Sequence, residues 1–125
     1  MLYQIDDRGR CYQVKDLPFR QTYDTWLAKF SAANISTDEI KSYMAENLAG
    51  LSKFSVATNF GGSWEGTPIQ SVYTVCRNNP EQAAMLLGRI IMDVLIYAEE
   101  EWLCTKTNLQ ERDFTTNFYW RKKTS

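Results

Sequence analysis

The sequence predicts an α+β fold in which a small antiparallel sheet packs against about four helices. Apolar and polar residues alternate near both ends of the chain, at 3–14 and at 114–121, as expected for strands. The middle of the chain instead carries helical spacing and helix-start signals. The 125 residues, 44% hydrophobic and 14% aromatic, fit a single globular domain over 1–125 with an aromatic-rich core.

The first predicted element is a β-hairpin. Apolar and polar residues alternate over 3–5 and 12–14, and the turn-forming residues 6–9 lie between them. A helix is then predicted over about 18–33, beginning at a proline, which is favoured in a first turn. Its apolar residues share one face, and their spacing indicates core positions rather than a ligand cage. These residues are Phe19, Tyr23, Trp26, Leu27 and Phe30.

A capping box predicts the start of the second helix. The side chains of Ser36 and Glu39 would each accept a hydrogen bond from a backbone N–H, and Gly50 is placed to end this helix. Residues 53–58 follow with an alternating pattern, and they are a candidate strand of the sheet.

Two further helices are predicted in the second half of the chain. Thr67 would cap a helix that begins at Pro68. The longest helix, near 80–103, has Asn79 as its N-cap and would place the acidic run 99–101 in its last turns. The final strand, 114–121, completes the sheet.

The longest helix is apolar over more than half of its circumference. It is therefore predicted to be the central helix of the domain or to pair on one side with another chain, which favours a homodimer. Its polar stripe consists of Gln82, Arg89, Asp93 and Glu100. The apolar arc consists of Ala83, Leu86, Leu87, Ile90, Ile91, Val94, Leu95, Ala98 and Trp102.

Composition excludes several classes of function. A net charge of −1 with a pI near 5.4 does not favour nucleic acid as a partner. Without histidine, the chain lacks Ser-His-Asp and Cys-His catalysis and histidine-bearing zinc sites. The three cysteines form no paired motif, which indicates a reducing cytoplasm. No segment resembles a signal peptide or a membrane span, so a soluble protein is expected.

The segment Asn59–Ser71 is the best candidate for a functional site. It gathers three glycines, a tryptophan and a glutamate directly before a helix start. We expect its ligand to be cationic or polar, because a carboxylate would repel an anion and an aromatic face attracts a cation. The alternative is a structural connection whose glycines serve the turn and whose tryptophan fills the core. The predicted ligand-binding residues are Phe60, Trp64, Glu65 and Tyr73.

The sequence favours a small non-enzymatic protein-interaction module, an inhibitor or adaptor that acts as a homodimer or on another protein. The alternative is a small-molecule-binding domain with its site at 59–67. A hydrolase or transferase using Glu65 as general base is the third hypothesis, and it would require a partner acid. No catalytic residue, metal or cofactor is predicted beyond these hypotheses.

Overall fold

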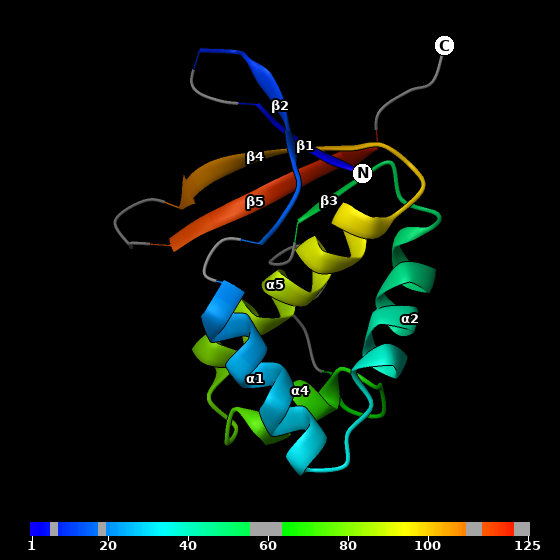
Figure 1. Ribbon diagram of the computed structural model, residues 1–125, viewed down its shortest axis with the longest axis vertical. Helices are drawn as coiled ribbons and strands as arrows, with labels where there is room; N and C mark the ends of the chain where they lie inside the picture. The colour runs from blue at the N-terminus through cyan, green and yellow to red at the C-terminus, as the bar shows by residue number, and fades with distance from the viewer. Residues whose placement is uncertain (6–7, 18–19, 56–63, 110–113, 122–125) are drawn as a thin grey trace.

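A computed structural model of the chain describes residues 1–5, 8–17, 20–55, 64–109 and 114–121. Within these ranges the chain is α+β, as predicted, and the helices gather on one side of a sheet (Figure 1). The strands are β1 (Leu2–Ile5), β2 (Cys11–Val14), β3 (Lys53–Ser55), β4 (Trp102–Leu109) and β5 (Phe114–Arg121). The helices are α1 (Arg20–Ala32), α2 (Thr37–Leu48), α4 (Gln70–Val75) and α5 (Pro80–Tyr97).

The sheet confirms the predicted hairpin and terminal strand, and it contains one strand that the sequence analysis missed. Of the candidate strand 53–58, residues 53–55 form β3 and residues 56–58 lie outside the described residues. The order of the sheet is β2-β1-β4-β5-β3, so the N-terminal hairpin and the C-terminal strand are joined through β4. The prediction of a purely antiparallel sheet is wrong, because β1 and β4 run parallel, with Leu2 opposite Trp102. The other neighbouring strands are antiparallel.

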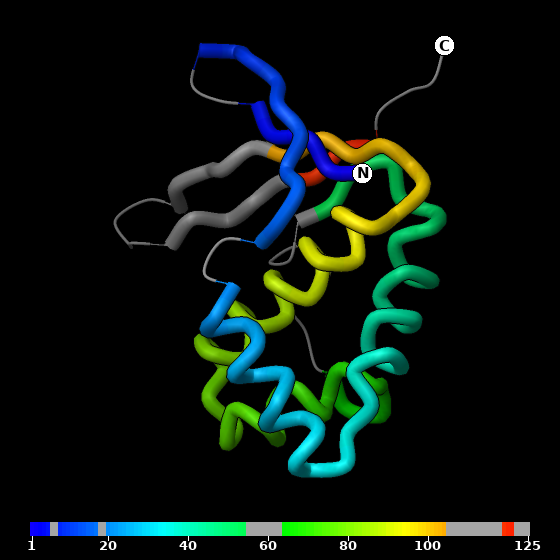
Figure 2. Tube along the Cα trace, in the orientation of Figure 1, coloured from blue at the N-terminus to red at the C-terminus, as the bar shows by residue number. Residues whose placement is uncertain are grey.

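Strand β4 replaces the predicted end of the longest helix. Helix α5 stops at Tyr97, and Ala98 already has extended backbone angles, with φ −68° and ψ 147°. The acidic run 99–101 explains this stop, because negative charge at a helix C-terminus opposes the helix dipole. The Trp102 N–H donates to the carbonyl of Met1 at 2.9 Å rather than to a carbonyl of α5. This bond starts the parallel pairing of β4 with β1 beside the N-terminus (Figure 2).

Helix α5 is the centre of the domain. It packs against β1 and against α1, α2 and α4. The predicted apolar arc lies in the core or packs directly against it, and Trp102 does so from β4 rather than from the helix. The buried residues of α5 are Ala83, Leu86, Leu87, Ile90, Ile91, Met92, Asp93, Leu95 and Ile96.

The helix starts agree with the sequence in two cases and differ in one. Ser36 accepts a hydrogen bond from the Glu39 N–H at 3.3 Å, and Asn79 caps α5. The predicted start at Pro68 is wrong, because α4 begins at Gln70 without a side-chain cap. The Thr67 hydroxyl instead donates to the carbonyl of Trp64 at 2.6 Å and holds the preceding turn.

Arg121 joins the end of the sheet to the end of α2. Its guanidinium donates to the carbonyls of Leu48 at 3.1 Å and Ala49 at 2.8 Å, and its Nε donates to that of Leu51 at 3.2 Å. It also pairs with Glu100 and lies 4.7 Å from the ring centre of Trp102. A basic group is favourable here, because the last carbonyls of a helix have no partner within the helix.

The cap of α5 provides a test of this architecture. The Asn79 side chain accepts hydrogen bonds from the N–H groups of Glu81 at 3.1 Å and Gln82 at 3.2 Å. Asn79→Ala should lower the free energy of unfolding by about 1 kcal/mol, measured by denaturant titration, whereas Asn79→Asp should retain the cap and the stability. Equal losses in the two variants would contradict the capping role.

Candidate functional site

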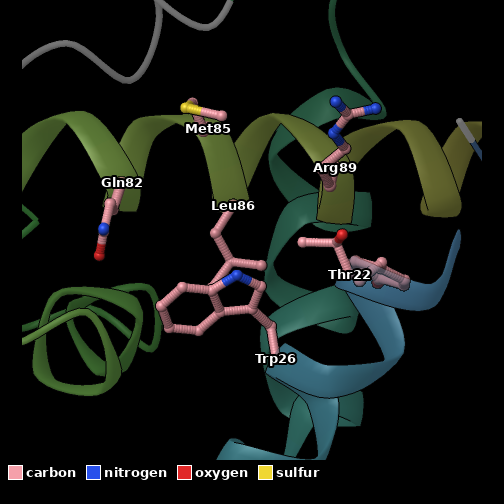
Figure 3. A pocket seen from close by; sticks show the side chains of 7 residues that line it. Thr22, Trp26, Gln82, Met85, Leu86 and Arg89 are labelled. Atoms are coloured by element: carbon pink, nitrogen blue, oxygen red, sulfur yellow. The ribbon is translucent and has the colours of Figure 1, made fainter. Parts of the chain in front are cut away.

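A largely apolar cleft lies between α1 and the first half of α5 (Figure 3). Its volume is about 360 Å³, within the range that binding sites in proteins occupy. Helix α1 supplies one wall and α5 the other. The lining residues are Thr22, Tyr23, Trp26, Gln82, Met85, Leu86 and Arg89.

Trp26 and Met85 are the accessible apolar groups of the cleft. Trp26 packs against the core, as its helical spacing predicted, but it is half-buried rather than fully covered. Lys29, one turn further along α1, places its ammonium 4.2 Å from the centre of the indole ring. Met85 is 61% exposed at the rim. An exposed methionine and an accessible tryptophan that line the same cleft are favourable contact groups, because both side chains offer large polarisable areas.

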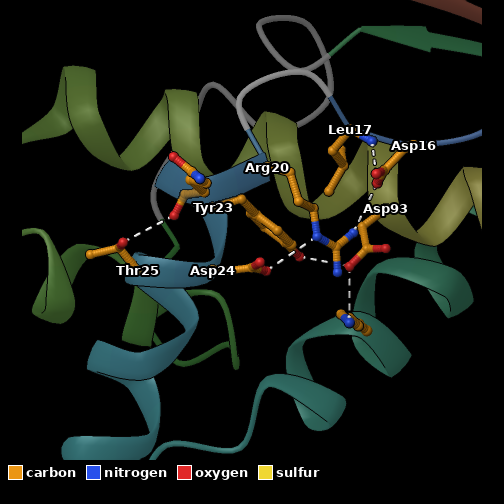
Figure 4. A network of polar contacts seen from close by, with 9 residues as sticks. Asp16, Leu17, Arg20, Tyr23, Asp24, Thr25 and Asp93 are labelled. Atoms are coloured by element: carbon orange, nitrogen blue, oxygen red, sulfur yellow. Dashed lines mark hydrogen bonds and ion pairs between the residues drawn. The ribbon is translucent and has the colours of Figure 1, made fainter.

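The inner wall of the cleft is fixed by a buried polar cluster. The Tyr23 hydroxyl donates to Oδ2 of Asp93 at 2.8 Å, and the same oxygen lies 3.0 Å from Nζ of Lys41 (Figure 4). Asp93 is 4% exposed, so its charge requires these partners. The cluster joins α1, α2 and α5 at one point. Burial, followed by the bond to Asp93, raises the pKa of Tyr23 well above its ordinary value and keeps the phenol neutral.

The outer side of α1 carries a second, exposed network. Arg20 lies 3.2 Å from carboxylate oxygens of both Asp16 and Asp24, and its guanidinium carbon is 5.8 Å from the ring centre of Tyr23 (Figure 4). Exposed ion pairs of this kind contribute little stability. The pair with Asp16 links the segment before α1 to its first turn, and the pair with Asp24 lies within the helix.

The lining of the cleft is suited to binding rather than to proton transfer. Its ionisable side chains are Tyr23 and Arg89. Tyr23 is held neutral by the cluster, and an arginine stays protonated in proteins. Neither group can act as a general base near neutral pH.

The residues predicted as a ligand site fall elsewhere. Trp64 is buried at 5% exposure, and its ring centre lies 4.4 Å from that of Tyr73, which is half-buried and packs against the core. Glu65 is exposed in the following turn, where Gly66 has a φ of 79°. Phe60 lies outside the described residues. Ligand binding by this group stays a prediction.

A shallow, acidic groove lies between α2 and the turn at Pro68. It has a volume of about 370 Å³. Three carboxylates and the ring of Tyr43 contribute to its surface. The lining residues are Asp38, Glu39, Ser42, Tyr43, Glu46 and Pro68.

The sequence analysis missed the α1/α5 cleft for identifiable reasons. Trp26 shares a helical face with core residues, and spacing does not show that its edge stays accessible. Met85 falls outside the apolar arc and was not singled out. The available signal was the spacing of Glu81, Met85 and Arg89 at intervals of four, which places them on one side of α5.

Comparison of the chain with protein-family models, with curated proteins and with solved structures finds no match. In the described part of the chain, no helix is both long and apolar enough to cross a membrane. Among the same residues, no group of three or more cysteine, aspartate or glutamate side chains is arranged to hold a metal ion.

The buried cluster predicts a strong dependence on Lys41. Lys41→Met leaves the Asp93 carboxylate buried without its cation, so the free energy of unfolding should fall by about 3 kcal/mol. The value lies at the lower end for a buried pair because the Lys41 side chain is 33% exposed. Denaturant titration provides the measurement, and the exposed Lys53 gives a matched control through Lys53→Met.

The double variant Lys41→Met/Asp93→Asn should recover part of the loss, because it leaves no charge buried. If Lys41→Met lowered the free energy of unfolding no more than Lys53→Met, the Lys41–Asp93 ion pair would not be holding α2 against α5.

Proposed function

We propose that the chain is a non-enzymatic protein-interaction module that acts as a homodimer. Its contact surface is the rim of the α1/α5 cleft, centred on Met85 and Trp26. The observation that carries the proposal is the 61% exposure of Met85, a large apolar side chain at the rim of the cleft. Burying such a side chain on association contributes roughly 1.5–3 kcal/mol.

The chemistry of the rim supports contact with a protein. Tryptophan, methionine and arginine are enriched at the centres of protein interfaces, and this rim provides one of each in Trp26, Met85 and Arg89. Methionine adapts its shape to an opposing surface, because it is unbranched and flexible. Thr22 and Gln82 add hydrogen-bonding groups at the edge.

The proposed dimer contact differs from the one that the sequence indicated. The wide apolar arc of α5 is covered within a single chain by the sheet and the other helices. The arc therefore leaves no uncovered apolar surface for contact with a second chain. The surface that remains is narrower and lies on the other side of the helix, around Met85.

The alternative function is binding of a small cationic or polar ligand near 59–67. Two observations favour a cation over an anion here. Glu65 is exposed in the turn that leads to Pro68, and the groove that Pro68 helps to line has three carboxylates. The hypothesis that Glu65 serves as a general base would need an acid and a substrate pocket beside it, and it stays untested.

The homodimer can be tested by sedimentation velocity over a concentration series. Wild-type protein should shift from monomer to dimer as its concentration rises. Met85→Glu should suppress the dimer, because it would bury a charge in the contact. Tyr97→Glu is the matched control, since Tyr97 is 71% exposed at the opposite end of the same helix. A monomer at high micromolar concentration would contradict the homodimer.

The alternative is tested with small amines and neutral polar compounds, with tryptophan fluorescence as the readout. A cationic ligand should bind more tightly than its neutral analogue, and Glu65→Gln should weaken binding without changing the thermal melt. Glu46→Gln separates the contribution of the acidic groove from that of the turn. An unchanged fluorescence signal throughout the series would return 59–67 to a structural role.

A further inference from the structure

The outer side of α5 carries opposite charges on either side of Met85. Glu81, Met85 and Arg89 are spaced by four residues, so they form one ridge along the helix. Glu81 is exposed and Arg89 is half-buried. Figure 3 shows the side chains of Met85 and Arg89 projecting from the same side of α5. Along the chain, the ridge is acidic, then apolar, then basic.

A low groove runs beside this ridge. The adjacent row of the helix surface contains Ala84 and Gly88, again four residues apart. Ala84 is exposed, and a Cβ built on Gly88 would meet no described atom within 4 Å. Helices associate when the ridge of one fits the groove of the other. The small residues therefore leave room for a ridge of a second helix to approach closely.

We infer that two copies of the chain pack through α5 in opposite directions, with the two-fold axis beside Met85. The inference rests on the proposed interaction function and adds the geometry of its contact. Each copy lays the ridge 81–85–89 over the Ala84–Gly88 row of the other. The two Met85 side chains meet at the centre, beside the rim of the α1/α5 cleft.

The charges select this direction. Four residues of α-helix span about 6 Å, so Glu81 and Arg89 stand at equal distances on either side of Met85. In the antiparallel arrangement Glu81 of one copy faces Arg89 of the second, and the same pair recurs across the axis. A parallel arrangement would oppose glutamate to glutamate and arginine to arginine. The ridge is thus complementary to itself in only one of the two directions.

Charge reversal tests the pairing. Glu81→Lys and Arg89→Glu, made separately, should each raise the dissociation constant of the dimer about tenfold, because two attractions become two repulsions. The double variant Glu81→Lys/Arg89→Glu restores opposite charges and should return to within about threefold of wild type. Sedimentation equilibrium gives the constants, and thermal melts at low concentration verify that each variant folds.

Two further variants do not depend on charge. Gly88→Gln should be tolerated by the monomer, since space is open above the glycine and most residues favour a helix more than glycine does. It should nevertheless weaken the dimer, because it fills the groove.

Met85→Cys, in a background in which the exposed Cys11 is replaced by serine, should form a disulfide between copies under oxidation, whereas Tyr97→Cys should not.

The outcomes separate this inference from the proposed function. A dimer that Met85→Glu disrupts, but that shows no recovery in the double charge variant and no Met85→Cys disulfide, overturns the antiparallel α5 contact and retains the interaction module. A chain that stays monomeric overturns both. Recovery by the double variant together with the disulfide establishes the geometry.

Discussion

The buried carboxylate of Asp93 is the constraint on which the arrangement of the helices depends. It lies within the central helix at 4% exposure, and a charge at such a position requires a cation and a hydrogen-bond donor. Lys41 from α2 and Tyr23 from α1 meet this requirement on one oxygen atom. Three helices are thereby brought to a single point, which a purely apolar contact, lacking direction, would not specify so narrowly.

The same constraint shapes the candidate interaction surface. Tyr23 serves the cluster with its hydroxyl and lines the α1/α5 cleft. Because α1 is anchored there, Trp26 one turn later is held at the edge of the core rather than inside it. The polar cluster and the accessible tryptophan therefore both depend on where α1 lies.

Arg121 connects the sheet to the helices through polar contacts, as Asp93 connects the helices to one another. It satisfies carbonyls at the end of α2 and pairs with Glu100 in the connection from α5 to β4. Residues from three distant parts of the sequence meet at this side chain. Its ion pair with Glu100 offsets one of the acidic charges that follow α5, and its bonds to the carbonyls of Leu48 and Ala49 connect the end of β5 to the end of α2.

Local signals in the sequence determined the α+β class, the hairpin, the terminal strand and the caps of α2 and α5, because these depend on nearest neighbours and side-chain period. The wide apolar arc of the helix predicted near 80–103 required that helix to be covered, either at the centre of the domain or by another chain, and the tertiary structure decided for the centre. Only the tertiary structure decided that Trp102 begins a strand, because its parallel partner β1 lies about a hundred residues away. Likewise, the polar stripe of α5 gave no sign that Asp93 would be buried or that Met85 would stay exposed. Those positions depend on where α1 and α2 dock, and docking is set by contacts between residues that are distant in the chain.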